Sequence, residues 1–261
     1  KSADDALGMT TKTEGIVRFD GELLRHYGTR DGMPTNETTA MMVDRDDRIW
    51  IGTRDRGVVV FDGDSFTTYD TTDGLVGNVI TCLFQDDGGK IWIGTREGFS
   101  RYDGHTFTNY GRRDGIRRHW VWNIQQTGPE DFWFVFEDSG IGRLRDGAFE
   151  TFLPEGESSG TKFMSLLKAA DGALWAGSKG RGLFRYREGT GWLRFPRENG
   201  LAGNTVSCLH QDTQGVIWIG CYNGGITRYD GETFQTLTME DGLPHHAIED
   251  FEDRDGEMWV T

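Results

Sequence analysis

The sequence lacks several features that would place it in common classes of protein. It has no apolar run long enough to span a membrane as a helix, and residues 1–5 lack the apolar core of a secretory signal. Its 28 basic residues are outnumbered by 42 acidic ones, giving a formal charge of -14. Such a charge opposes docking on a nucleic-acid backbone. We therefore predict no membrane insertion by this chain and no nucleic-acid partner.

Proline and cysteine are also scarce, whereas glycine is abundant. The 261 residues include 5 Pro, 3 Cys and 38 Gly, and only 36% are hydrophobic. Three cysteines cannot all be paired within one chain, so we interpret Cys82, Cys208 and Cys221 as small buried residues and not as a disulfide framework. The many glycines predict a domain rich in turns.

Tryptophan recurs at nearly constant spacing, in steps of 42, 41, 42, 43 and 41 residues. A fixed period of this length is the signature of a repeat architecture. We predict that the recurring residues form the structural core of the repeats. They are Trp50, Trp92, Trp133, Trp175, Trp218 and Trp259.

One period, residues 73–115, shows what each repeat contains. Four short apolar or alternating segments at residues 79–84, 90–95, 99–102 and 106–110 are separated by turns rich in Asp and Gly. We name them strands A, B, C and D. Four short antiparallel strands per period, with a Trp in strand B, predict a blade of a β-propeller.

The repeats predict an all-β fold, a six-bladed β-propeller of four-stranded antiparallel blades. Residues 1–8 are expected to be an N-terminal tail and residues 9–261 one propeller domain of six repeats of about 42 residues. The sequence stops inside a strand B and begins just before a strand C. We therefore expect the N- and C-terminal strands to share one blade and close the ring; a segment of a longer array is the alternative.

The repeat resembles a known family. Asp86, the run Ile91-Trp92-Ile93-Gly94-Thr95, Tyr102-Asp103-Gly104 and Asp114-Gly115 are similar to the two-component regulator propeller repeat. This resemblance covers residues 9–261. It implies a sensory domain of a bacterial hybrid two-component system, located in the periplasm or outside the cell, and in several members a carbohydrate ligand. A sensing or binding role is thus expected.

Strand direction predicts which loops share a face. The D-to-A and B-to-C loops lie at one end of the blades, where unlike polar residues occupy matching repeat positions. Such a ring suits a ligand funnel, although an unselected solvent surface gives the same pattern. The candidate ligand-binding residues at this end are Arg54, Arg96, Arg117, Arg118, His119, Trp120, Glu137, Lys179, Tyr222, Asn223, His245 and His246.

The third repeat departs most from the others. Residues 112–122 contain four Arg and two Trp that are out of register with the repeat. Arg pairs with carboxylates and aromatic faces stack on sugars, so this stretch favours an acidic, carbohydrate-like ligand. In the alternative interpretation the blade is repacked, with Trp122 filling its interior.

No pattern supports a metal, a cofactor or catalysis. The Asp-rich turns at residues 44–47 and 253–256 lack the later ligands of a calcium loop, and His245-His246 lacks the spacing of a zinc pair. We predict no catalytic residue, no metal and no cofactor. The expected function is a noncatalytic module that binds a small molecule or an oligosaccharide. A protein-protein interaction scaffold is the alternative, and a polysaccharide lyase or glycoside hydrolase is a further one.

Overall fold

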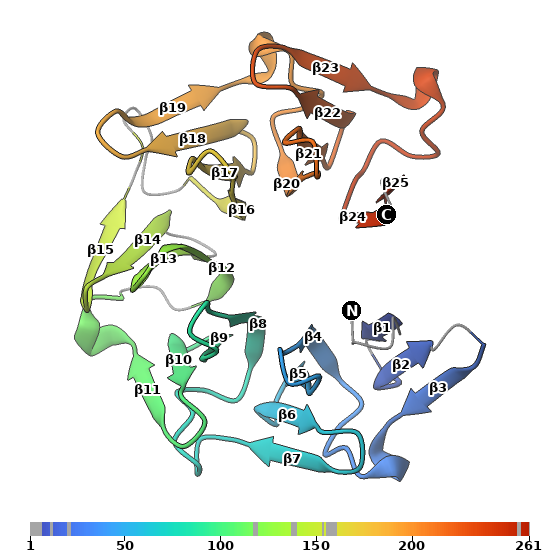
Figure 1. Ribbon diagram of the computed structural model, residues 1–261, viewed down its shortest axis with the longest axis vertical. Coiled ribbons are helices and arrows are strands. Elements are labelled where there is room, and N and C mark those ends of the chain that lie inside the picture. The colour runs from blue at the N-terminus through green and yellow to red at the C-terminus, as the bar shows by residue number, and fades with distance from the viewer. Residues whose placement is uncertain are drawn as a thin grey trace. The chain divides into compact units, whose positions relative to one another are not determined.

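The computed structural model describes residues 7–10, 13–19, 22–116, 120–136, 140–152, 154, 161–254 and 257–260. It divides into two compact units, Lys1–Ile124 and Gln125–Thr261. The regular elements described are β-strands and four short 3-10 turns (Figure 1). In the described part of the chain, no helix is long and apolar enough to cross a membrane.

The first unit contains three antiparallel sheets. The N-terminal sheet has the order β1-β2-β3, and the next two have the orders β4-β5-β6-β7 and β8-β9-β10-β11. The strands are β1 (Leu7–Thr10), β2 (Ile16–Phe19), β3 (Leu24–Tyr27), β4 (Thr38–Val43), β5 (Ile49–Thr53), β6 (Val58–Phe61), β7 (Phe66–Tyr69), β8 (Ile80–Gln85), β9 (Ile91–Thr95), β10 (Phe99–Tyr102) and β11 (Phe107–Tyr110); the 3-10 turns are η1 (Thr29–Asp31) and η2 (Arg112–Asp114).

The second unit repeats the same pattern. Its four-stranded sheets run β12-β13-β14-β15, β16-β17-β18-β19 and β20-β21-β22-β23, and β24 pairs with β25; the boundary between the units falls within β12. The elements are β12 (Val121–Gly128), β13 (Asp131–Phe136), β14 (Ile141–Arg145), β15 (Ala148–Phe152), β16 (Phe163–Lys168), β17 (Leu174–Ser178), β18 (Leu183–Arg187), β19 (Gly191–Phe195), η3 (Arg197–Asn199), β20 (Val206–Gln211), β21 (Ile217–Cys221), β22 (Gly225–Tyr229), β23 (Phe234–Leu237), η4 (Met239–Asp241), β24 (Phe251–Arg254) and β25 (Glu257–Val260).

These sheets confirm the all-β fold of four-stranded antiparallel propeller blades. In the period of residues 73–115, the observed strands β8 to β11 begin and end within one residue of the predicted strands A to D. The expected tail of residues 1–8 is too long, because β1 begins at Leu7 and pairs with β2 in the place of a strand B. The shared closing blade and the single domain of residues 9–261 stay predictions, since both concern the two units together.

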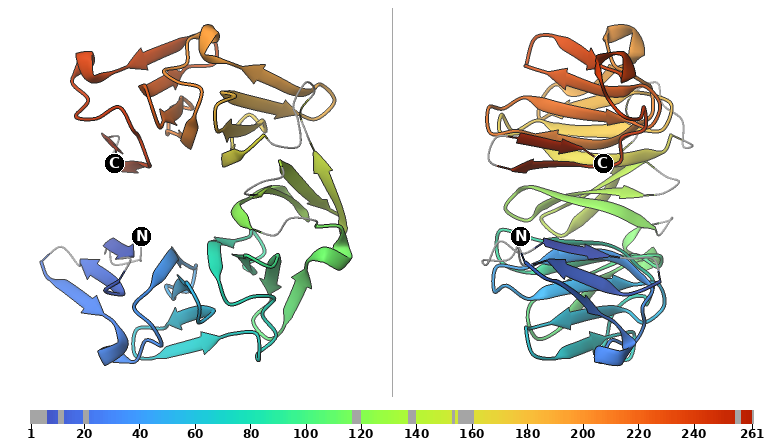
Figure 2. Two further views of the ribbon diagram at one scale, coloured as in Figure 1. Left: turned by 180° about the vertical axis from the view of Figure 1, so that it is seen from behind. Right: turned by 90° about the vertical axis from the view of Figure 1, so that its right-hand side faces the viewer.

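The core lies between neighbouring sheets and not within any one of them. Figure 2 shows the sheets of each unit stacked on one another. In the first unit Trp50 packs with Ile80 and Ile93 of the following sheet, and in the second Trp175 packs with Val206 and Ile219 of the following sheet. Within each unit, a blade with a neighbour on both sides, such as the sheet β4–β7 or the sheet β16–β19, therefore supplies one face to each of two hydrophobic layers, as in other repeat folds.

Four of the recurring tryptophans are buried: Trp50, Trp92, Trp133 and Trp175 are only 0–2% exposed. Trp218 is partly buried against its neighbours. The expectation that Trp259 belongs to the core is wrong, because its side chain is 59% exposed. Trp259 lies in a sheet for which only β24 and β25 are described, without the strands C and D whose aromatic side chains cover the ring elsewhere.

Four of the repeats fix their Trp through a side chain six residues earlier. The indole Nε1 donates to Asp44 in the case of Trp50 (2.8 Å) and to Asp86 in the case of Trp92 (2.9 Å). The same bond joins Trp133 to Thr127 (3.1 Å) and Trp218 to Asp212 (2.8 Å). A buried indole N–H is costly without an acceptor, so this contact orients the ring.

The glycine of the Trp-Ile-Gly motif is required by the approach of the next blade. A Cβ at Gly52 would lie 2.6 Å from Ile80 Cγ2, and one at Gly220 would lie 2.8 Å from Ile248 Cγ2. Neither distance is compatible with a side chain. The motif is therefore a packing signature of the interface between blades.

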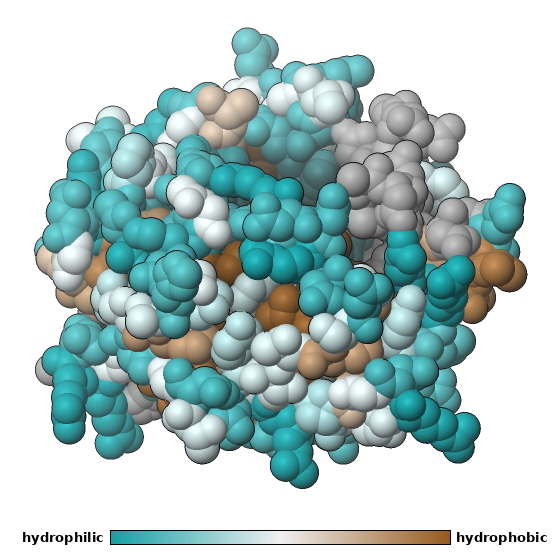
Figure 3. Space-filling model, turned by 60° about the horizontal axis from the view of Figure 1, so that its bottom comes forward, coloured by the Kyte–Doolittle hydropathy of each residue, from teal (hydrophilic) through white to brown (hydrophobic). Residues whose placement is uncertain are grey.

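The exterior agrees with the acidic, weakly hydrophobic composition. On the face seen in Figure 3, hydrophilic residues dominate and hydrophobic ones show mainly in recesses between them. Most apolar residues pack in the layers between blades. The loops at the blade ends therefore carry mainly polar side chains, and such loops are where functional residues are expected.

Candidate functional site

The D-to-A and B-to-C loops meet at one end of the blades, as predicted. In the first unit the backbone N–H of Arg96 donates to the carbonyl of Val79 (3.2 Å), and that of Gly57 donates to the carbonyl of Asn78 (3.0 Å). In the second unit Tyr222 donates in the same way to Thr205 (2.9 Å). Positions that are far apart in each repeat are thus brought together at this end.

The Asn that recurs at this end is structural. Asn78 Oδ1 accepts from the backbone N–H of Thr71 (2.9 Å), and Asn204 Oδ1 accepts from that of Arg197 (2.8 Å), so each side chain closes its own D-to-A loop. Its backbone carbonyl binds the preceding blade. His246 occupies the corresponding position, because its carbonyl accepts from Gly225 (3.0 Å). His246, rather than His245, is therefore the repeat equivalent.

A cavity of about 770 Å³ opens at this end of the first unit. It lies beside the B-to-C loop after β9 and the D-to-A loop that contains η2. Its lining comprises Val76, Arg96, Glu97, Asn109, Gly111, Arg112, Arg113 and Asp114. Three guanidinium groups face two carboxylates here, so the lining carries an excess of one positive charge in a chain of charge -14.

Arg96 is held against Trp120, which precedes β12. Its guanidinium carbon lies 3.7 Å from the centroid of the indole ring, the geometry of a close cation–π stack. Arg96 Nε is buried and has no hydrogen-bond partner among the described residues. An unpaired buried donor of this kind is an energetic cost that an incoming acceptor would remove.

Trp122 stands beside this stack. Its ring centroid lies 6.3 Å from that of Trp120, and its side chain is 45% exposed. The interpretation in which Trp122 fills the blade interior is therefore wrong. The repacked interior of this blade is formed instead by Phe134, Val135 and Phe136, which are all buried; Val135 and Phe136 replace the Gly and Thr of the repeats at Trp50 and Trp92.

A hydrogen-bonded set of polar groups forms the floor near the cavity. The hydroxyl of Ser100, which is fully buried, donates to Asn109 Oδ1 (2.7 Å), and Asn109 Nδ2 donates to the carbonyl of Gly74 (2.8 Å). The backbone N–H of Val76 in turn donates to Ser100 Oγ (3.0 Å). The floor is thus fixed by internal bonds, and the arginines of the lining supply the positive charge of the cavity.

The other predicted residues do not line this cavity. In the first unit, Arg54 pairs with Glu37 (3.1 Å) on the surface. In the second unit, Lys179, Tyr222 and Asn223 are exposed, and His245 stacks on His246 with ring centroids 4.4 Å apart. Arg117, Arg118, His119 and Glu137 lie outside the described residues.

Four lining residues lie outside both the candidate residues and the stretch 112–122: Val76, Glu97, Asn109 and Gly111. Asn109 lies in β11, and its position in a strand did not indicate that its side chain lines a cavity beside the loops. Glu97 directly follows Arg96, so its place in the B-to-C loop was visible in the sequence, whereas the orientation of Asn109 depends on the hydrogen bond from Ser100.

The three cysteines are free, and burial raises the pKa of the Cys82 and Cys208 thiols to about 12. They are therefore protonated at neutral pH and unsuited to act as nucleophiles. Within the described ranges, no group of three His, Cys, Asp or Glu side chains is placed to hold a metal ion.

An ion pair in β13 and β14 has a structural role. Burial opposes the charge of Asp131, yet the bidentate Arg143 holds the pKa of its carboxyl below the usual range. The Arg143 guanidinium also lies 4.8 Å from the Trp133 ring centroid. This pair therefore covers the repeat core.

Comparison with known proteins confirms the family resemblance. The profile of the two-component regulator propeller family matches residues 32–55, 74–97 and 200–223. A search of curated proteins found no match.

Solved structures share the fold. The extracellular domain of a proposed hybrid two-component system from B. thetaiotaomicron is 18% identical, with a TM-score of 0.82 over 100% of this chain and 37% of that one. For a proposed one-component system from B. thetaiotaomicron the identity is 21%, the TM-score 0.78 and the coverage 100% and 36%. A catalytically inactive virginiamycin B lyase from Staphylococcus aureus, with quinupristin, is 15% identical, with a TM-score of 0.76 over 100% of this chain and 89% of that one. The chain thus spans little more than a third of the first two, and at these identities the likeness concerns the fold alone.

Proposed function

Given that this chain carries two-component regulator propeller repeats, we propose that it is a noncatalytic sensory module that binds a carbohydrate-like, acidic ligand. The ligand sits at the end of the blades formed by the D-to-A and B-to-C loops. In the first unit, the cavity beside Arg96 receives it. A periplasmic or extracellular location belongs to the same proposal.

The stacked, unpaired Arg96 is the observation that carries this proposal. The Trp120 ring fixes the guanidinium plane at the cavity wall, and the buried Nε has no partner among the described residues. A preorganised guanidinium loses little side-chain freedom when it donates hydrogen bonds to a carboxylate. Arg112 and Arg113 line the same cavity and add positive charge for a polyanionic ligand.

The size and the aromatic rim support a sugar. About 770 Å³ lies within the range of sites that hold small organic ligands. The exposed Trp122 ring offers an apolar face beside the arginines, the combination that a sugar ring with an acidic substituent needs. The ligand proposed is therefore a uronic acid or sulfated oligosaccharide.

Titration calorimetry of the purified chain with acidic and neutral oligosaccharides of equal length tests this proposal. We expect saturable binding of the acidic series only, weakened at least tenfold by Arg96→Gln, because the charge-assisted bond is lost. Arg54→Gln is the matched control, since Arg54 occupies the same repeat position but pairs with Glu37 away from the cavity.

The same samples separate the alternatives. Equal binding by wild type and Arg96→Gln would move the site away from this cavity. Turnover of the sugar, measured by mass spectrometry, would replace the sensory proposal by a lyase or hydrolase. Absence of any sugar binding would favour the protein-protein interaction scaffold.

A further inference from the structure

The indole N–H of Trp175 lacks the acceptor that other repeats supply. The residue six positions earlier is Ala169, where Asp44, Asp86, Thr127 and Asp212 stand in the other repeats. Trp175 is nevertheless 2% exposed, and no residue in the described part of the chain accepts a hydrogen bond from its Nε1. The side chain is buried, but its Nε1 is not among the buried unpaired atoms, so this donor is open to solvent and an acceptor can reach it.

The backbone around Ala169 keeps the geometry of the other repeats. Ala169 donates its N–H to the carbonyl of Ala173 (2.8 Å), as Asp212 does to Val216 (3.0 Å). The difference is therefore confined to the side chain. Asp171 takes over part of the missing role, since its Oδ1 accepts from the N–H of Ala173 (3.0 Å), but it does not bind the indole.

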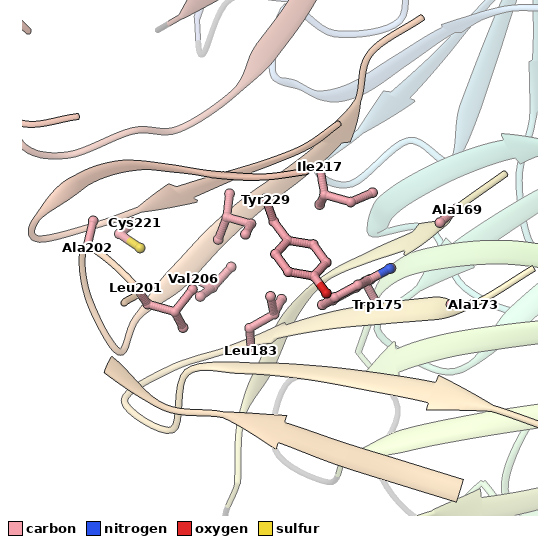
Figure 4. Close-up of a cluster of buried hydrophobic side chains, with 11 residues drawn as sticks. Ala169, Ala173, Trp175, Leu183, Leu201, Ala202, Val206, Ile217, Cys221 and Tyr229 are labelled. Carbon is pink, nitrogen blue, oxygen red and sulfur yellow. The ribbon is translucent and has the colours of Figure 1, made fainter. Parts of the chain in front are cut away.

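A cavity of about 300 Å³ lies at this place in the second unit. It is at the end of the blades that carries the A-to-B and C-to-D turns, and its lining includes Ala169, Asp171, Trp175, Arg185 and Gln211. Figure 4 shows the nitrogen of Trp175 directed away from Leu183, towards the side on which Ala169 lies. The unpaired donor therefore belongs to the cavity wall.

The charges around the cavity favour an anion. Asp171 is neutralised by its ion pair with Arg187. Arg185, opposite Trp175 in the strand register, has its guanidinium carbon 5.5 Å from the centroid of the indole ring. No carboxylate of a described residue forms an ion pair with Arg185. One positive charge is thus left facing the cavity.

In the following blade, β20–β23, a carboxylate of the chain interacts with both a Trp indole and an Arg guanidinium. There Trp218 and Arg228 are paired in register, as Trp175 and Arg185 are. Burial opposes the charge of Asp212, yet the hydrogen bond from Trp218 and the charge of Arg228 hold its pKa below the usual range. The protein thus stabilises a carboxylate in this geometry when the chain supplies one.

We propose that the cavity beside Ala169 binds a small organic carboxylate. One oxygen accepts the hydrogen bond from Trp175 Nε1, in the place that an Asp side chain takes in other repeats, and the charge faces Arg185. The cavity is larger than an acetate group, so a hydroxy acid or another short carboxylic acid also fits. This site is independent of the one proposed at Arg96.

The test follows the indole N–H resonance of Trp175 by ¹H–¹⁵N NMR, assigned with Trp175→Phe, during titration with acetate at constant ionic strength. We expect a saturable shift with acetate and none with acetamide, which has the same shape but no charge. The Trp218 resonance is the internal control and should not move, because Asp212 already binds that indole.

Two variants sharpen the outcome. Ala169→Asp supplies the carboxylate from the chain and should abolish the acetate response. Arg185→Gln should weaken acetate binding at least fivefold, and this result does not depend on whether the Ala169→Asp variant folds. The reciprocal change Asp212→Ala should create an acetate response at Trp218. An equal response to acetamide, a response that persists in Ala169→Asp and Arg185→Gln, or no saturable shift of Trp175 would overturn the proposal.

Discussion

The bond between Asp44 and Trp50 offers a direct test of how each blade fixes its tryptophan. Asp44 is 4% exposed and accepts four hydrogen bonds. Its Oδ2 accepts from Trp50 Nε1 (2.8 Å) and Arg48 Nε (2.8 Å), and its Oδ1 accepts from the N–H groups of Asp46 and Arg48 (2.9 Å each). Replacement by Ala removes all four.

The loss of stability in Asp44→Ala depends on which of the four hydrogen-bond donors can bond to water instead of the carboxylate. Trp50 is 1% exposed, so its N–H stays unpaired at a cost of about 1–3 kcal/mol. The Arg48 side chain is 43% exposed, and its ion pair contributes about 0.2–1 kcal/mol. The turn amides can bond to water. We expect Asp44→Ala to lower the free energy of unfolding by about 2–3 kcal/mol.

Asp44→Asn should be nearly as costly as Asp44→Ala, because every partner of the carboxylate is a donor and the Asn amide group must face one of them. Urea denaturation followed by tryptophan fluorescence measures the loss. A double-mutant cycle with Trp50→Phe should give a coupling of about 1 kcal/mol or more. Additivity of the two changes, or an Asn variant as stable as wild type, would refute this account of the bond.

The pH dependence supplies an independent check. Burial opposes the charge of Asp44, but its hydrogen bonds from Trp50 and Arg48 hold its pKa below the usual value of 3.8. A lowered folded-state pKa gives stability that is fully present above the unfolded-state pKa and is lost as pH falls through the folded-state value. The difference between wild type and Asp44→Ala should therefore shrink as the pH falls below about 4.

Three further outcomes follow from the packing between blades. Gly220→Ala should destabilise the protein by about 1–3 kcal/mol in urea denaturation, because its Cβ would meet Cys208 Sγ and Ile248. Gly128→Ala, with 3.8 Å to its nearest neighbour, should be close to neutral and is the control. Trp92→Ala should cost about 3–5 kcal/mol by the same assay, since the ring is fully buried; wild-type stability would show that it is not core. Cys208, with a pKa of about 12, should resist iodoacetamide at pH 8 until the protein unfolds, and rapid labelling of the native protein would contradict its burial.

The sequence was sufficient to predict strands to within one residue where a repeated pattern existed. The Trp position, the alternation of strand B and the Asp-Gly turns all recur. Strand bounds predicted in one repeat can therefore be compared with those predicted in the others. Trp259 shows where this reasoning fails, because a recurring Trp is buried only when further strands of its own sheet cover it. Asn78 shows a second limit: a residue that recurs at the candidate end of the blades can serve the loop backbone itself.

The candidate site was less predictable because it depends on side-chain geometry. Arg96 was expected from its place in the repeat, and Trp120 from its departure from it. Their stacking at 3.7 Å is a matter of side-chain geometry that spacing does not give, and Arg96 Nε has no partner among the described residues. The sequence shows Ala169 where other repeats have Asp44 and Asp212. Only the structure shows that these two carboxylates accept the hydrogen bond from the indole N–H of the repeat Trp.

The loop-closing asparagines have a consequence for how such a module can change its specificity. Asn36, Asn78 and Asn204 each secure the backbone of a D-to-A loop through their own amide oxygen, and their carbonyls hold the loop of the preceding blade. The exposed carboxylates of Asp31 and Asp73 add to this, since they accept from the backbone N–H groups of Gly28 (2.9 Å) and Asp70 (3.0 Å) within the same loops. Neighbouring positions can then exchange Arg, Lys or Tyr while the fold stays intact. One scaffold can in this way acquire new ligands by surface substitution alone, with little loss of rigidity.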